Sequence, residues 1–121
     1  MTTDGNPGIT VRHDDQRRLY EAVVDDRVVG YLVYEVAGQT VSLTHTVVEP
    51  QMRGRGVGSA LARFALDDLR ERRQRPTVLC SFVTDFVARN PDYRGLIDHV
   101  IDTRPGRFGR TQWTMEDDDE R

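Results

Sequence analysis

The stretch VVEPQMRGRGVGSALARFAL, residues 47–66, runs from strand-like apolar residues through a glycine- and arginine-rich segment into a helical pattern. From Val57 onward, apolar residues recur at intervals of three and four, which indicates an amphipathic helix. Glycines occupy positions 54, 56 and 58, at the entrance to this helix. A helix start leaves about four backbone N–H groups without internal acceptors and carries partial positive charge. Because glycines leave these groups open to a bulky anion, we interpret the junction as a phosphate- or pyrophosphate-binding turn.

The side chains around these glycines favour the same interpretation. Arg53 and Arg55 add positive charge, and Ser59 adds a hydroxyl group. The alternative is an ordinary turn with solvated arginines, since a GxG pattern alone is weakly specific. Two other phosphate-binding motifs do not match: the P-loop needs GxxxxGK before Ser or Thr, and the dinucleotide fingerprint needs GxGxxG in the first strand–helix unit.

The order of elements predicts an α+β (mixed α/β) fold with one central sheet. Residues 9–13 are expected to form a first strand, and residues 19–48 three antiparallel strands with tight turns at 25–26 and 37–39. The helix from Val57 ends before Pro76, and a short strand is expected at 77–80. Two short helices divided by Pro91 follow, with Ser81 or Thr84 as an N-cap.

The composition fits one small soluble domain. The 121-residue chain is 37% hydrophobic with a net charge of −3, so no global basic field favours nucleic acid. A single cysteine excludes an internal disulfide and a cysteine zinc cluster, and we expect no metal. No apolar run approaches the roughly 20 residues that span a bilayer, and the N-terminus lacks signal-peptide features, so we expect a cytoplasmic protein without membrane contact. We expect a flexible arm at 1–8, a folded domain at 9–102, and a flexible acidic tail at 103–121.

Four segments carry a resemblance to a known family. The segment QMRGRGVG, residues 51–58, is similar to the acyl-CoA pyrophosphate loop of Gcn5-related N-acetyltransferases, written Q/R-x-x-G-x-G/A. The segments LTHTVV (43–48), LCSFVTDFV (79–87) and RNPDYRGLI (89–97) resemble the small, single-domain subgroup of that family. The resemblance covers roughly residues 19–100 and rests on four stretches in the same order.

This resemblance implies an acetyl-CoA site. The strands that end at Val48 and Cys80 would splay apart, with helices on the sheet faces and acetyl-CoA in the wedge between the strands. The pantetheine arm would lie along Val47 and Val48. Backbone N–H groups would hold the pyrophosphate at residues Arg53, Gly54, Arg55, Gly56, Val57, Gly58 and Ser59.

Two residues are candidates for the chemistry. The resemblance points to Cys80, at the position where the subgroup carries its characteristic cysteine. A cysteine needs a nearby base or positive environment to react as thiolate, and His45 shares a predicted strand face with Val41, Leu43 and Val47. We expect His45 and Cys80 to face each other near the acetyl group. Structural roles, a buried core cysteine and a core histidine, remain open for both.

Asn90 and Tyr93 belong to the matching RNPDYRGLI segment. They are candidates for contact with the pantetheine or adenine of CoA, and the alternative is a structural role in which Tyr93 packs in the core. His13 and His99 have no visible partners, which favours surface or structural positions. We expect Trp113 to dock on the domain or on a partner.

Two functions remain open at this point. The leading one is an acetyl-CoA-dependent acetyltransferase that acts on an amine of a small molecule or protein side chain, directly or through Cys80. The other is a sensor that binds acetyl-CoA or CoA with little catalysis. Nucleic-acid binding through Arg53, Arg55 and the run RERRQR is disfavoured by the net acidic charge. The sequence does not indicate the acceptor or the oligomeric state.

Overall fold

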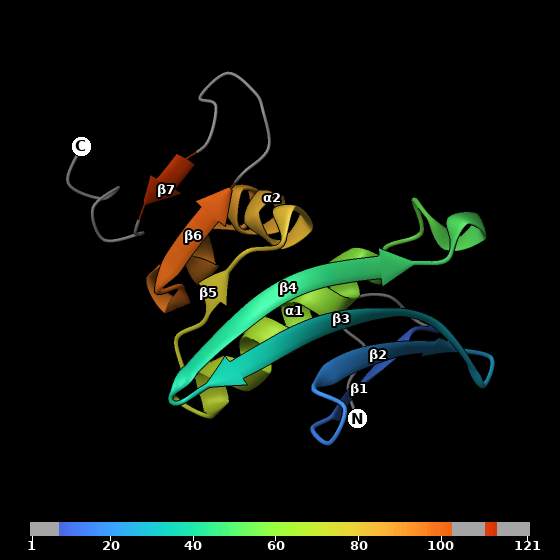
Figure 1. Ribbon diagram of the computed structural model, residues 1–121. Helices are drawn as coiled ribbons and strands as arrows, with labels where there is room; N and C mark the ends of the chain where they lie inside the picture. Colours follow the sequence, from blue (N-terminus) through green and yellow to red (C-terminus); the bar gives the residue numbers. More distant parts are fainter. Residues whose placement is uncertain (1–7, 103–110, 114–121) are drawn as a thin grey trace.

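The structure, a computed structural model, describes residues 8–102 and 111–113 (Figure 1). Within these residues, seven strands form one sheet in the order β1-β2-β3-β4-β5-β6-β7. The strands are β1 (Thr10–Asp14), β2 (Leu19–Val24), β3 (Arg27–Ala37), β4 (Thr40–Val48), β5 (Thr77–Val78), β6 (His99–Asp102) and β7 (Thr111–Trp113). Neighbours pair antiparallel except β4–β5 and β5–β6, which are parallel. The mixed sheet confirms the predicted fold class.

The tight turns lie where the sequence predicts them. Asp25 and Asp26 connect β2 to β3 with φ values of 51° and 64°. Positive φ at both central residues is the requirement of the two-residue turn whose twist matches a hairpin, and aspartate tolerates it better than most residues. Gly38, at φ 61°, serves the turn between β3 and β4. These two turns place β2, β3 and β4 side by side as an antiparallel meander.

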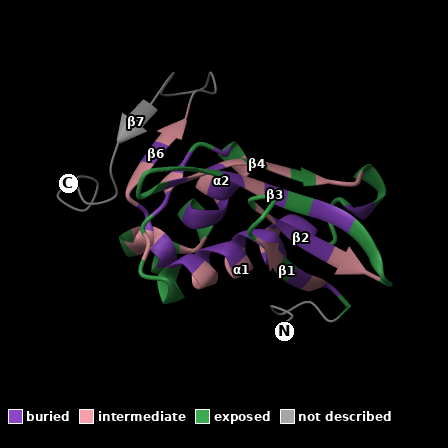
Figure 2. Ribbon diagram, turned by 60° about the horizontal axis from the view of Figure 1, so that its bottom comes forward, coloured by how far each residue is buried: buried purple, intermediate pink, exposed green. Residues whose placement is uncertain are grey.

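The helix α1 (Val57–Glu71) packs across one face of the sheet and supplies much of the core (Figures 1 and 2). Leu61, Ala65 and Leu66 are fully buried against the strands. Burial of one leucine side chain stabilises a fold by roughly 1.5–3 kcal/mol. The burial recurs at the predicted helical intervals, which confirms the amphipathic helix.

The strand β5 is shorter than predicted because the chain leaves the sheet after Val78. The backbone N–H groups of Leu79 and Cys80 both donate to the Leu43 carbonyl, at 2.9 and 3.1 Å. Two consecutive amides that converge on one acceptor turn the chain away from β4. The parallel pairing therefore stops at Leu43–Val78, and the splay begins two residues earlier than expected.

The 3-10 helix η1 (Pro50–Met52) lies between β4 and α1, and α2 (Ser81–Arg89) and the 3-10 helix η2 (Pro91–Leu96) follow β5. Pro91 divides α2 from η2, as predicted. The predicted N-caps are wrong: Cys80 occupies the N-cap position of α2 without a side-chain capping bond. Ser81 lies one residue inside the helix, and the Thr84 hydroxyl donates back to the Cys80 carbonyl at 3.1 Å.

The predicted tail contains one segment that the structure describes. Trp113 lies in β7, where its backbone pairs with Val100 of β6. The rest of the tail and the predicted arm up to residue 7 lie outside the described residues. No helix in the described ranges is long and apolar enough to cross a bilayer.

Candidate functional site

A pocket of about 660 Å³ lies where β4 separates from β5. It is bounded by the end of β4, the η1–α1 segment and the side chain of Phe82. Most of the residues predicted to hold a cofactor line it: Val47, Val48, Arg53, Gly54, Gly56, Val57, Gly58 and Ser59. Arg55 does not line it, and its guanidinium lies 3.9 Å from Met52 Sδ. The structure thus brings the predicted turn and the predicted strand end to one cavity.

The glycines shape this pocket in two different ways. Gly54 and Gly56 have φ values of 79° and 89°, a conformation that L side chains rarely adopt. A Cβ on Gly58 would lie 2.7 Å from the Phe82 ring, so this glycine is required by the close approach of Phe82 to α1. The sequence predicts that the glycines leave open space for an anion. This prediction holds for Gly54, where a Cβ would meet nothing within 4 Å.

The start of α1 has the electrostatics of an anion site. Gly56 is its N-cap and offers no side-chain capping bond, and the first turn contains no acidic residue. The first N–H groups of a helix have no acceptor within the helix, and the helix dipole concentrates positive charge there. Arg53 adds a formal positive charge at the same pocket. This arrangement fits a phosphate or pyrophosphate.

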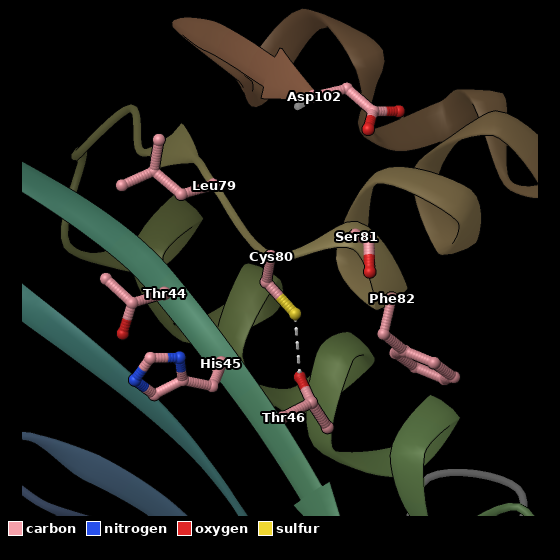
Figure 3. Close-up of a pocket in the computed structure, with 8 residues that line it drawn as sticks. All are labelled: Thr44, His45, Thr46, Leu79, Cys80, Ser81, Phe82 and Asp102. Atoms are coloured by element: carbon pink, nitrogen blue, oxygen red, sulfur yellow. Dashed lines mark hydrogen bonds between the residues drawn. The ribbon is translucent and has the colours of Figure 1, made fainter. Parts of the chain in front are cut away.

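A second pocket, of about 310 Å³, adjoins the first (Figure 3). Thr46 and Phe82 line both cavities. The remaining lining residues of the second pocket are Thr44, His45, Leu79, Cys80, Ser81 and Asp102. Cys80 is 5% exposed, lies on the segment between β5 and α2, and lines the second pocket but not the first.

The expectation that His45 faces Cys80 is wrong, because β4 contains a bulge. Val33 of β3 pairs with His45 and Tyr34 pairs with Leu43, so Thr44 is an extra residue on β4. An extra residue reverses the alternation of side chains beyond it. Leu43 is buried, but His45 is exposed and its ring points away from the sulfur (Figure 3).

Thr46 takes the place expected for His45. Its Oγ1 lies 3.2 Å from Cys80 Sγ, within hydrogen-bond distance for sulfur (Figure 3). Sequence reasoning missed this residue because strict alternation puts positions 41, 43, 45 and 47 on one face. The available signal is the run Thr-His-Thr, in which polar residues occupy both faces of the strand after Leu43.

Asn90 and Tyr93 lie away from both pockets and bond to other parts of the protein. The Tyr93 hydroxyl donates to Asp67 Oδ1 at 2.8 Å, and the ring is 5% exposed. Burial, followed by the bond to Asp67, raises the pKa of Tyr93 above its ordinary value. The Asn90 side-chain amide donates to the Phe86 carbonyl at 2.8 Å. These contacts favour the structural alternative, and contact with CoA stays a prediction.

In the residues that the structure describes, no group of three or more His, Cys, Asp or Glu side chains could hold a metal. The polar side chains that line the two pockets are those of Thr44, His45, Thr46, Arg53, Ser59, Cys80, Ser81 and Asp102.

Comparisons with known proteins agree with this geometry. A family model described as GCN5-related N-acetyl-transferase matches residues 19–96. Protein NATD1 of Xenopus tropicalis is 36% identical over 92 residues, which are 73% of this chain and 83% of that protein. A mycothiol acetyltransferase of Mycolicibacterium smegmatis is 47% identical over 53 residues, 43% of this chain and 18% of that one.

A solved structure shows the same fold. A GCN5-like protein from Staphylococcus aureus, determined by NMR, superposes with a TM-score of 0.57 at 17% identity, over 75% of this chain and 89% of that one. The family model covers more than half of the 121 residues and spans β2 to η2, which includes the first pocket and every lining residue of the second except Asp102. The chain therefore belongs to the GCN5-related N-acetyltransferase family, and its activity is acetyl transfer.

Proposed function

We propose that this protein moves the acetyl group of acetyl-CoA to the amine of a small molecule or an exposed protein side chain, with Cys80 as the first group to accept it. One observation carries the proposal: the pocket at the start of α1 and the pocket lined by Cys80 share Thr46 and Phe82, and Cys80 Sγ lies 3.2 Å from Thr46 Oγ1. A transferase needs a donor site and an acceptor site that share one reacting point.

The larger pocket fits CoA in its charge and its shape. The uncapped first turn of α1, the left-handed glycines and Arg53 suit the pyrophosphate. Val47 and Val48 lie on the part of β4 that extends beyond its pairing with β5. A strand edge without a neighbour can bond to the amide groups of an extended ligand, as in the addition of a strand to a sheet.

Cys80 is placed to accept an acyl group. When bound, acetyl-CoA supplies an acetyl group activated as a thioester. The Cys80 thiolate would form a bond to the acetyl carbon as the bond to the CoA sulfur breaks, and the CoA thiol takes up a proton. The amine then bonds to the same carbon, and Cys80 Sγ leaves and regains its proton. Cys80 is the N-cap of α2, and positive charge at a helix start favours a thiolate.

The acetyltransferase assignment does not depend on this covalent step. In a direct transfer, the amine would enter through the smaller pocket and react without Cys80. Both routes use the same two pockets, so the first test addresses the cofactor and the acceptor, and the second addresses the cysteine.

Ligand-dependent thermal stability tests the cofactor site. CoA and acetyl-CoA should raise the melting temperature of the protein, because a ligand that binds the folded state stabilises it by mass action. Release of CoA thiol should then exceed background with an acceptor from a panel of polyamines, amino acids and peptides. Binding without thiol release across the panel would contradict turnover on amines and favour the sensor. A melting temperature that neither ligand changes would contradict the cofactor site.

Intact-mass measurement tests the role of Cys80. Incubation with acetyl-CoA and no amine should add the mass of one acetyl group to the wild-type protein. The variant Cys80→Ala should not gain it, and free amine should remove it from the wild type. If the adduct forms equally on both proteins, the covalent route fails and direct transfer remains.

A further inference from the structure

We propose that Thr46, and not His45, controls the reactivity of Cys80 by donating a hydrogen bond from Oγ1 to the thiolate at Sγ. The inference rests on the proposed function only in giving that thiolate a use in acetyl transfer. Its structural basis is the 3.2 Å contact between the two side chains.

The bulge in β4 creates this contact. The extra residue at Thr44 turns the side chain of Thr46 toward the segment that leaves β5. The Thr44 hydroxyl is directed elsewhere and donates to the Val33 carbonyl at 3.1 Å. The two threonines thus sit two residues apart on one strand, and only Thr46 bonds to the sulfur.

The backbone of Cys80 is held on both sides, so the sulfur can move only by rotation about one side-chain torsion. Its N–H donates to the Leu43 carbonyl at 3.1 Å. Its own carbonyl accepts from the Thr84 backbone N–H at 3.0 Å and from the Thr84 hydroxyl at 3.1 Å. Because the backbones of Cys80 and Thr46 are both held, the hydrogen bond between their side chains restricts only the side-chain torsions of these two residues.

The chemistry of the two groups decides the direction of this bond. A thiol can donate to the threonine oxygen or accept from its hydroxyl, whereas a thiolate can only accept. Cys80 is 5% exposed, so few water molecules can solvate a negative sulfur there. A hydroxyl donor at 3.2 Å supplies part of the missing solvation and stabilises the thiolate selectively.

The other titratable groups around the sulfur are the same in the wild type and in a variant of Thr46. His45 from β4 and Asp102 from β6 are the titratable side chains that line the same pocket with Cys80. The start of α2 favours the thiolate, and a negative carboxylate disfavours it. A variant that lacks the Thr46 hydroxyl keeps these groups in place, so the effect of this hydroxyl on the reactivity of Cys80 can be measured separately.

The rate of alkylation by iodoacetamide as a function of pH tests the inference. Cys80 is the single cysteine of the chain, so mass spectrometry reports on this sulfur alone. The variant Thr46→Val keeps the shape of the side chain and removes the donor. It should react about tenfold more slowly at pH 7, with the midpoint of its rate profile about one pH unit higher and the plateau at high pH unchanged. Thr46→Ser should restore the wild-type profile.

The matched control is Thr40→Val, which removes an exposed hydroxyl from the start of the same strand, outside the pocket that Cys80 lines, and should behave as the wild type. A wild-type midpoint for Thr46→Val would overturn the proposal. An equal shift of the midpoint in Thr40→Val, or a change in the plateau alone, would also overturn it. So would a wild-type alkylation rate that does not depend on pH. Thermal melting of each variant confirms that it is folded. Alkylation needs no acetyl-CoA, so a shifted midpoint without cofactor binding would uphold Thr46 and reject the proposed function.

Discussion

The two ends of α1 differ in whether their polar groups have hydrogen-bond partners within the protein. At its start, the N-cap Gly56 makes no side-chain capping bond, and the first turn borders a pocket of about 660 Å³. Toward its end, Asp68 accepts from the Tyr20 hydroxyl and from Arg72 Nε, both at 2.8 Å. We call the start of α1 the open end, because it presents backbone donors to a cavity. We call the other end the closed end, because its side-chain donors and acceptors bond to one another within the protein.

His13 completes the closed end. Its Nε2 lies 2.6 Å from the Tyr34 hydroxyl, its Nδ1 lies 3.0 Å from Arg72 Nη2, and its ring stacks on Tyr20 at 4.5 Å between centroids. An arginine can only donate, so Nδ1 accepts and Nε2–H donates to Tyr34, which is the neutral form of the ring. Burial, and then the charge of Arg72, lower the pKa of His13, although Asp68 opposes them.

Whether a polar side chain has partners within the protein distinguishes structural from functional residues better than its residue type does. His13 and His45 are both histidines on strands, but the first is bonded on both ring nitrogens and the second lines a pocket. Groups that satisfy one another stabilise the fold, and groups that face a cavity are available to a ligand. Mutations at one end of α1 should therefore change stability, and mutations at the other should change ligand affinity.

The largest effect is expected for Gly54→Val at the open end. A β-branched residue at φ 79° is strained by roughly 1–2 kcal/mol, and its side chain would also occupy the open space beside the turn that the anion needs. We expect the dissociation constant for CoA to rise about 100-fold, measured by calorimetry. The control is Gly95→Val, where φ is not positive and a Cβ would meet nothing within 4 Å. Equal losses in both variants would contradict the role of the turn.

Asp68→Ala should give the next effect, at the closed end. It leaves the Tyr20 hydroxyl, on a residue that is 1% exposed, without its acceptor and removes a partner of Arg72. We expect the free energy of unfolding in urea to fall by about 2 kcal/mol, since a buried polar group without a partner costs roughly 1–3 kcal/mol. CoA affinity of the folded protein should not change. Glu71→Ala, an exposed change on the same helix, serves as control.

Acid should weaken the closed end through His13. Because the folded state holds the pKa of His13 below 6.5, the unfolded chain binds this proton first as the pH falls. The free energy of unfolding should therefore decrease from about pH 6.5 down to the folded pKa, with a slope of up to about 1.4 kcal/mol per pH unit. Urea titrations at several pH values should show a shallower slope for His13→Gln. An identical slope in both proteins would mean that His13 is not the group responsible.

The sequence was sufficient wherever a local pattern determines the structure. Two aspartates specify the turn at Asp25–Asp26, the spacing of apolar residues specifies α1, and the glycines mark the pocket at its start. Each of these signals lies within a few neighbouring residues. Local backbone preferences and periodicity therefore predict the meander of β2, β3 and β4, the helix α1 and the anion-binding turn, whereas the resemblance to the family supplied the role of Val47 and Val48.

Features that depend on distant partners could not be predicted in this way. The bulge at Thr44 depends on how β4 pairs with β3, and a shift of one residue exchanges His45 for Thr46 next to Cys80. The partners of His13 include Arg72, which lies 59 residues away in the sequence. No local pattern identifies which arginine or tyrosine a histidine will meet.

Tyr93→Phe gives the smallest expected effect and decides between the two sequence interpretations of Tyr93. If Tyr93 has a structural role, loss of its hydrogen bond to Asp67 should lower the free energy of unfolding by about 1 kcal/mol, the usual contribution of one hydrogen bond. The dissociation constant for CoA should stay within a factor of two, because neither Tyr93 nor Asp67 lines the cofactor pocket. A tenfold loss of CoA affinity with unchanged stability would instead place Tyr93 at the cofactor, and would show that satisfied hydrogen bonds do not mark structural residues in this protein.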